Sequence, residues 1–186
     1  MPILGILASQ ISGHLAAPNS YESIATVTVG SGGAASATFS SIPATYSHLQ
    51  IRGIIRQSTG GFDQALAQFN SDTGNNYARH ALLGEGTTAS AEATTSTNKV
   101  SFAAIAGGGQ TASVFGVTVT DILDYTNTNK YTTTRSLGGV DDNGSGYIWF
   151  SSGLWMNTAA ITTITITPGG GNFVQYTQFA LYGVRA

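Results

Sequence analysis

Residues 46–56, YSHLQIRGIIR, hold the clearest secondary-structure signal in this 186-residue chain. One parity of this run holds Leu49, Ile51, Gly53 and Ile55, and the other holds Gln50, Arg52, Ile54 and Arg56. Side chains alternate across an extended strand, so this spacing predicts a strand with one buried face and one exposed face.

Similar short runs, rich in β-branched and aromatic residues and bounded by Gly, Pro, Asn or Ser, recur along the chain. Ten such runs predict a β-sandwich or barrel of about 8–10 strands. They cover residues 21–29, 37–39, 46–56, 65–69, 100–105, 114–122, 131–136, 147–151, 161–167 and 173–184.

Three segments are less regular. Residues 76–83 fit either a helix or a strand, and residues 84–98, GEGTTASAEATTSTN, predict an exposed loop because they are poor in apolar residues. The run 173–184 has large residues at both parities, which predicts a central strand covered on both faces.

The first twenty residues differ from the rest. Apolar residues there recur four apart, which fits a narrow helical stripe, although Gly5 and Gly13 leave a strand or a frayed arm equally open. We divide the chain into an arm, 1–20, and a sandwich, 21–186, and expect the arm to anchor the protein or join subunits. The candidate anchor residues are Ile3, Leu4, Leu7, Ile11 and Leu15.

The composition limits the chemistry. Charged residues make up 9% of the chain and hydrophobic residues 41%, whereas charge near 25% is typical of soluble domains. The net charge of −2, the scattered bases and the lack of a long apolar run predict neither a nucleic-acid nor a membrane partner. The chain has no Cys, which excludes disulfides and thiolate metal sites, and we expect no cofactor. With few charges to protect strand edges, we expect a neighbouring subunit to cover some edges or faces.

Motifs for catalysis are weak. The three histidines, His14, His48 and His80, do not have metal-ligand spacing, and no nucleophile elbow or phosphate loop occurs. The triple glycines at 107–109 and 169–171 predict turns with positive φ.

Two acidic stretches are candidates for chemistry. Asp121 and Asp124 are three apart, so a strand places them on opposite faces, which does not suit the paired carboxylates of a glycosidase. The run Asp141–Gly146, DDNGSG, could begin a calcium loop, but it lacks the closing Glu. A hairpin turn explains the same residues better, because Asn-Gly is a strong hairpin signal. We therefore predict that the protein is not an enzyme and binds no metal.

Aromatic residues gather in the last third of the chain. They could line a glycan site, but sandwich cores use the same residues, and a core role is favoured for each. The residues are Tyr147, Trp149, Phe150, Trp155, Tyr176 and Tyr182.

Six stretches together carry a family resemblance. They are GILASQISG (5–13), SIPATYSHLQIRG (41–53), FNSDTGNNYARH (69–80), DILDYTNTNKYTTTRSLGG (121–139), SGLWMNTAAITTITITP (152–168) and QFALYGVRA (178–186). In these stretches the chain resembles a widespread group of tailed-bacteriophage structural proteins. Members of that group are encoded among virion genes and look like single jelly-roll domains.

The resemblance implies a jelly-roll β-sandwich on the exterior of a virion, assembled in the bacterial cytoplasm. It implies a capsid decoration protein or a fibre or tail-associated module, forming a homotrimer and binding major capsid or tail proteins. The alternative is a receptor-binding knob for host-surface glycan, with exposed Trp or Tyr beside Asp or Asn near 87–98 or 141–146. A hydrolase is a further rival that would need convergent carboxylates.

Overall fold

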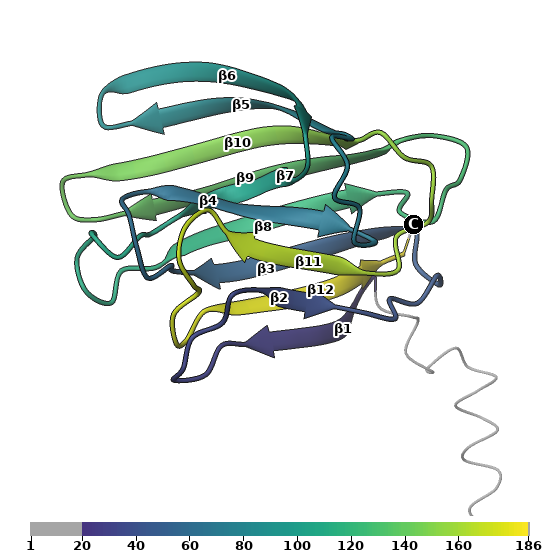
Figure 1. Cartoon of the computed structure of the whole chain (residues 1–186), viewed down its shortest axis with the longest axis horizontal. Coiled ribbons are helices and arrows are strands. Elements are labelled where there is room, and N and C mark those ends of the chain that lie inside the picture. The colour runs from purple at the N-terminus through teal and green to yellow at the C-terminus, as the bar shows by residue number, and fades with distance from the viewer. Residues whose placement is uncertain (1–19, 186) are drawn as a thin grey trace, which may run out of the picture.

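The computed structural model describes residues 20–185, which form two antiparallel β-sheets packed face to face (Figure 1). Twelve strands and no helix occur within this range, and the all-β sandwich predicted from the sequence is confirmed. The strands are β1 (Tyr21–Thr28), β2 (Ala37–Phe39), β3 (His48–Ile55), β4 (Asp63–Phe69), β5 (Tyr77–Glu85), β6 (Thr88–Thr97), β7 (Val100–Ile105), β8 (Gly116–Leu123), β9 (Thr132–Asp141), β10 (Gly146–Trp155), β11 (Ile164–Pro168) and β12 (Gln178–Val184).

The strand order is that of a jelly roll with two added hairpins. The large sheet has the order β1-β12-β3-β8-β9-β10-β5-β6, and the small sheet has the order β2-β11-β4-β7. Eight of the strands form two four-stranded layers, in which β1-β12-β3-β8 faces β2-β11-β4-β7. The chain passes between the two layers as it does in the two Greek keys of a jelly roll. The hairpins β9–β10 and β5–β6 extend the first of these sheets on one side.

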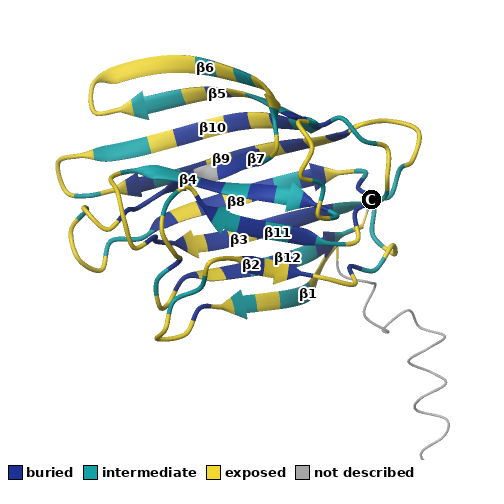
Figure 2. Cartoon of the chain, in the orientation of Figure 1, coloured by how far each residue is buried: buried dark blue, intermediate teal, exposed yellow. Residues whose placement is uncertain are grey.

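All ten predicted runs contain or overlap strands, and the two further strands are β5 and β6. The segment 76–83 is mostly strand β5, which resolves the open choice between helix and strand. The prediction of a loop at 84–98 is wrong, because Thr88–Thr97 pairs with β5 after a turn at Gly86, whose φ is +55°. β6 is the last strand of its sheet and is exposed along most of its length (Figure 2), so no buried apolar alternation marked it in the sequence.

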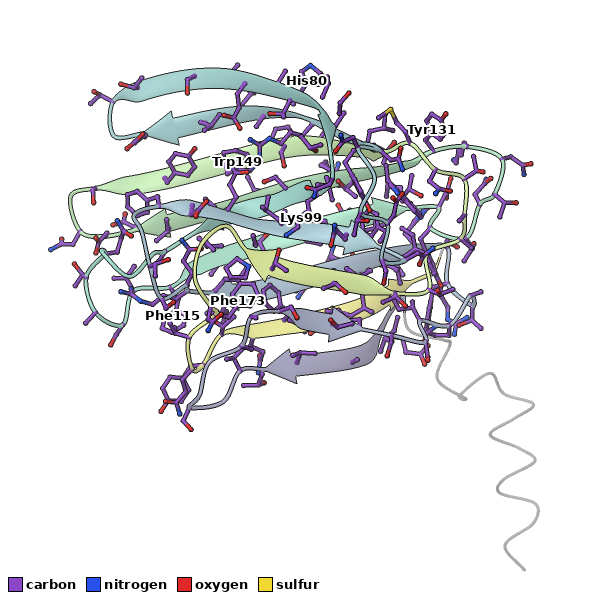
Figure 3. The ribbon with its side chains drawn as sticks, viewed as in Figure 1. His80, Lys99, Phe115, Tyr131, Trp149 and Phe173 are labelled. Carbon is purple, nitrogen blue, oxygen red and sulfur yellow. The ribbon has the colours of Figure 1, made fainter. Side chains whose placement is uncertain are left out.

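The main core lies between the sheets. Phe69, Tyr77, Phe102 and Trp155 are all nearly inaccessible to solvent, and their rings pack with centroids 5.5–6.3 Å apart. A smaller core forms where the added hairpins meet β7. There Trp149 packs with the buried side chains of Ala81 and Ala104, and Figure 3 places Trp149 within the sheets while His80 lies at their rim.

One turn is tied firmly to this core. The Asp72 carboxylate accepts hydrogen bonds from Trp155 Nε1 at 2.8 Å, from the side chain of Asn76 and from the backbone N–H of Gly74. The Tyr77 hydroxyl lies 3.0 Å from the backbone nitrogen of Phe69, and burial raises the pKa of that phenol to about 12. The β4–β5 turn is therefore fixed against β10 by polar contacts as well as by packing.

Two local predictions need correction. Among the triple glycines, positive φ occurs at Gly171, whereas Gly107 and Gly108 instead lie so close to the backbone of residues 58–61 that a Cβ would collide with it. β12 is central, pairing with β1 and β3, but residues 20–185 cover only one of its faces. The large residues on the other face of this stretch, such as Tyr176, are exposed or half-buried, because a jelly roll has two layers and no third layer covers that face within the described residues.

Candidate interaction surface

The outer face of the large sheet carries a continuous band of exposed apolar side chains. On this face Val119 pairs across strands with Leu137, Leu137 pairs with Phe150, and Phe150 pairs with Leu82. These cross-strand partners form one row from β8 to β5, and Ala91 on β6 continues it. Neighbouring side chains in such a row lie about 4.5–5.5 Å apart, so the row is one contiguous surface.

A second row runs parallel to the first. Ile54 pairs with Val117, Val117 with Gly139, Gly139 with Ile148, and Ile148 with Gly84. The seven large apolar side chains of the two rows are between 41% and 63% exposed. We call them the outer apolar face, and they are Ile54, Leu82, Val117, Val119, Leu137, Ile148 and Phe150.

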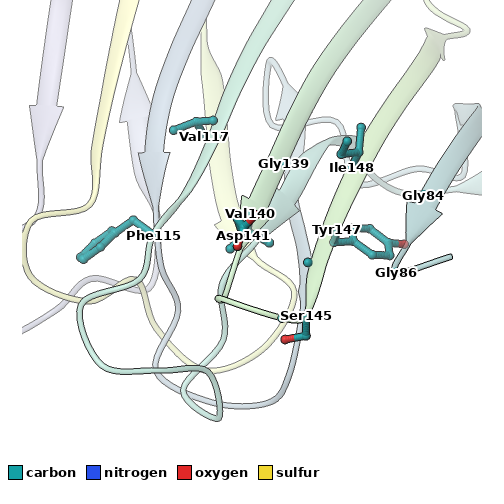
Figure 4. Close-up of a pocket in the computed structure, with 12 residues that line it drawn as sticks. Gly84, Gly86, Phe115, Val117, Gly139, Val140, Asp141, Ser145, Tyr147 and Ile148 are labelled. Carbon is teal, nitrogen blue, oxygen red and sulfur yellow. The ribbon is translucent and has the colours of Figure 1, made fainter.

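Glycines hollow out the second row. Gly139 lies between Val117 and Ile148 and has no side chain to fill the space between them (Figure 4). The resulting hollow has a volume of about 700 Å³ and is also lined by Phe115 and the β9–β10 turn. Ile148, the most exposed residue of the outer apolar face at 63%, projects beside it.

Charged and polar side chains at one end of this side of the sheet form a hydrogen-bonded network. Arg135 donates to Asp121 at 2.6 Å, and the amide of Gln50 donates to the same carboxylate at 2.9 Å. Arg52 donates to Gln50 Oε1, and its guanidinium lies 5.4 Å from the ring centre of Tyr182. Asp121 balances the charge of Arg135, whereas Arg52 contacts neutral groups and leaves one positive charge at this end of the sheet.

A separate polar hollow lies on the other side of the added hairpins. Phe62, Asp63, Gln64, Glu85 and Tyr147 line about 300 Å³. The rings of Phe62 and Tyr147 are stacked, with centroids 6.2 Å apart, and Tyr147 is half-buried. Burial, together with the nearby carboxylates of Glu92 and Glu85, raises the pKa of the Tyr147 phenol, so it remains a hydroxyl donor at neutral pH.

The candidate histidines do not converge. His48 Nδ1 accepts the backbone N–H of Asp124 at 3.0 Å, and His80 is exposed on the outer face of β5. His14 and the anchor residues lie outside the described residues. Within residues 20–185, no group of three His, Asp or Glu side chains is placed to hold a metal ion.

Eight of the nine carboxylates have structural partners within the described range. Asp124 pairs with Lys130, which holds the pKa of that carboxyl below its ordinary value despite some burial. The others are Glu22 with Arg185, Asp63 with Gln57, Asp72 with Trp155, Glu92 with Arg79, Asp121 with Arg135, Asp141 with Asn143 and Asp142 with Thr111. No hydrogen bond or ion pair engages the carboxylate of Glu85 in the described part of the chain.

The Asp141–Gly146 run forms the turn between β9 and β10. The backbone N–H of Asp142 donates to Ser145 at 2.7 Å, and both Asn143 and Gly144 have positive φ, at 48° and 116°. The hairpin interpretation is therefore confirmed. The two acids face different partners, because Asp141 accepts from the turn itself and Asp142 accepts from the Thr111 backbone.

The aromatic residues divide between core and surface. Trp149 and Trp155 are buried, as favoured from the sequence, whereas Phe150 is 44% exposed and belongs to the outer apolar face. Sequence reasoning missed that face as a site. The available signal was the run Tyr147–Phe150, YIWF, in which both parities are apolar although only one can face the core.

Comparison with known proteins gives little further guidance. No family model matches the chain, and no curated protein matches it. Among solved structures it is similar to SCLam, a non-specific endo-β-1,3(4)-glucanase from family GH16, with 10% identity and a TM-score of 0.21. The match covers 80% of this chain and 60% of that one. A match at this level carries no functional argument. In residues 20–185 there is also no helix long and apolar enough to cross a membrane.

Proposed function

We propose that this protein is a non-enzymatic structural component of a tailed-bacteriophage virion, on the outside of the particle, where it binds other copies of itself and other virion proteins. The observation that carries the proposal is the outer apolar face. Monomeric proteins rarely expose a contiguous apolar surface of this kind, and such surfaces mark interaction sites. The family resemblance of the sequence supplies the virion context.

The carboxylates support a binding role over a hydrolytic one. A glycosidase needs two carboxyl groups about 5–10 Å apart facing one sugar. In the described chain the Glu85 carboxylate has no protein partner, while the nearby Asp63 accepts hydrogen bonds from Gln57 and from the backbone of Gln64. That hollow therefore offers one free acid rather than a pair.

The test is to locate the protein on particles. Intact virions from the source of this sequence would be purified by density gradient, labelled with an antibody against residues 20–185 and imaged. We expect regular labelling of head, tail or fibre. Particles that carry neither label nor peptides of this protein by mass spectrometry would refute the proposal.

The arm is the proposed attachment to the particle. Deleting residues 1–16 removes Ile3, Leu4, Leu7, Ile11 and Leu15 while leaving every described strand intact. We expect the truncated protein to fold and to lose occupancy on particles. Normal occupancy would show that the anchor lies elsewhere.

A second candidate function is recognition of host-surface glycan at the polar hollow. Stacked aromatic rings beside Asp63, Gln64 and Glu85 supply both an apolar platform and hydrogen-bonding groups, as a sugar requires. A glycan array with the purified protein tests this. Glu85→Gln should weaken any positive signal, whereas the distant control Glu22→Gln should not, and a blank array removes this candidate.

A further inference from the structure

We propose that the outer apolar face packs against the same face of a second copy of this chain, related by a two-fold axis. This deepens the proposed assembly function by naming the partner of the outer apolar face. It rests on four properties of the described residues, namely the extent, the shape and the charge of the face and the side of the sheet on which its side chains lie.

The extent approaches that of a stable interface. The outer apolar face lies on five neighbouring strands, from β3 to β5, and Ala91 continues it onto β6; at a spacing of about 4.8 Å these six strands span about 24 Å. β3 and β8 have eight residues each, which at about 3.3 Å per residue gives a length of about 26 Å. The outer side of these strands therefore projects roughly 600 Å², with the outer apolar face at its centre and the polar residues Gln50, Arg52, Asp121 and Arg135 at one end, and this area approaches the ~800 Å² that each partner contributes to a standard stable complex.

The shape is self-complementary. A two-fold contact brings the same patch of both copies together, so each projection must meet a recess on that same patch. Ile148 is the most exposed side chain of the face, and the hollow over Gly139 lies directly beside it. A two-fold axis near β9 and β10 lets Ile148 of each copy enter the hollow of the other.

The charge on the face selects a like partner. Asp121 and Arg135 neutralise each other, and Arg52 is held by Gln50 and lies over Tyr182. Arg52 keeps its positive charge, but it lies on β3, away from the proposed axis near β9 and β10, so the two copies of this charge stay apart when the faces join. A polyanion or an anionic membrane would find no unpaired cationic cluster to bind.

The two-layered fold suits sheet-on-sheet packing. Antiparallel sheets pack face to face about 10 Å apart, with side chains such as Val, Leu, Ile and Phe filling the space between them. The alternation that buries Trp149 on the inner side places Ile148 and Phe150 on the outer side. A paired molecule would be a four-layered sandwich, with the large sheets in the middle.

The experiment measures the mass of the full chain by light scattering or analytical ultracentrifugation over a range of micromolar concentrations. We expect the wild type to have twice the chain mass of 19.1 kDa. Ile148→Glu should weaken the dimer at least tenfold, because it places a charge at the centre of the contact. Tyr176→Glu is the matched control: Tyr176 is 70% exposed but lies in the turn before β12, off the face, so the dimer should persist.

Thermal melting confirms that each variant is folded. If Ile148→Glu does not fold, Leu82→Lys on β5 makes the same test at a residue 60% exposed. A wild-type monomer at all concentrations overturns the proposal, as does an oligomer whose mass neither substitution changes. If the wild type is monomeric and binds an apolar dye only after residues 1–19 are deleted, the arm covers the face and the proposal is again overturned.

The two proposals can fail separately. A dimer in solution that is absent from particles refutes the virion role and leaves the pairing intact. A protein that is monomeric in solution but is detected on particles refutes the pairing and leaves the virion role intact. The homotrimer implied by the family resemblance predicts three times the chain mass in the same measurement, and that mass would overturn the two-fold pairing.

Discussion

Removing the Asp72 carboxylate should destabilise the whole sandwich, although this residue lies in a surface turn. Its oxygens accept from Trp155 Nε1, Asn76 Nδ2 and the backbone N–H of Gly74. Trp155 is only 1% exposed, so in Asp72→Ala its indole N–H loses its acceptor in a place that water reaches poorly.

The expected cost follows from these contacts. A buried donor left without an acceptor costs about 1–3 kcal/mol, and an ordinary hydrogen bond contributes about 0.5–1.5 kcal/mol. Asp72 is itself partly exposed, so water replaces part of what is lost, and we expect about 2 kcal/mol in total. For a domain of this size, 1 kcal/mol shifts Tm by about 2–4 °C, so Tm should fall by about 4–8 °C.

The acid dependence gives a second readout. Burial by itself would raise the pKa of Asp72, but hydrogen bonds from Trp155, Asn76 and Gly74 outweigh burial and hold that pKa below its ordinary value of 3.8. The ionised carboxylate is therefore favoured in the folded state. Its contribution to stability is complete above the unfolded-state pKa and is lost as the pH falls through the lower folded-state pKa.

The assay is thermal or urea unfolding of wild type, Asp72→Ala, Asp72→Asn, Trp155→Phe and the double variant Asp72→Ala/Trp155→Phe. Asp72→Asn keeps a neutral acceptor and should cost less than Asp72→Ala. Both Asp72 variants should lose less stability than the wild type on acidification below about pH 4. A Tm within about 1 °C of wild type for Asp72→Ala, or a double-mutant cycle with no coupling, would refute the reasoning.

Three further predictions follow from local geometry. Gly153→Ala should lower Tm by about 2–12 °C, measured by calorimetry, because the added Cβ collides with Val100 and Thr134 and overpacking costs about 1–3 kcal/mol. Arg56→Lys should speed amide exchange in residues 110–115 and leave β3 and β8 protected, because the guanidinium donates to three loop carbonyls at 2.7–3.0 Å; unchanged exchange would contradict this. Calcium should not stabilise the protein, because Asp141–Gly146 is a hairpin turn. At about 5 mM calcium, which is above the Kd of about 1 mM of weak calcium modules, Tm should stay within about 1 °C of its value in EDTA. A calcium-dependent rise in Tm would show otherwise.

Much of the fold follows from local patterns. The alternation at Leu49, Ile51 and Ile55 places these residues in the core because a strand has a period of two, whatever its neighbours are. The Asn143–Gly144 turn was also predictable from local sequence, because Asn and Gly tolerate positive φ. β6 was missed because neither of its faces is buried, so its sequence carries no burial pattern.

The candidate surface could not be read from the sequence in the same way. Apolar residues occur at both parities around Trp149, and the sequence does not say which parity faces the core. The face that packs in the core is decided by the sheet on the other side of the sandwich, which is built by pairing between segments far apart in the chain. The partners of the carboxylates could not be predicted from the sequence either, because the partner of Asp121 is 14 residues away and that of Asp72 is 83 residues away.

The sequence by itself determined a low-charge, cysteine-free chain of short antiparallel strands, because composition and strand period are local properties that each segment carries with it. Tertiary structure decided the order of the strands, the extension of one jelly-roll sheet by two hairpins, and the exposure of Ile148 and Phe150 beside a glycine hollow. The small sheet has four strands and the large sheet has eight, and the chain folds with the outer side of the large sheet uncovered within residues 20–185. An apolar side chain becomes a binding surface only when the layers of the fold leave it open to solvent.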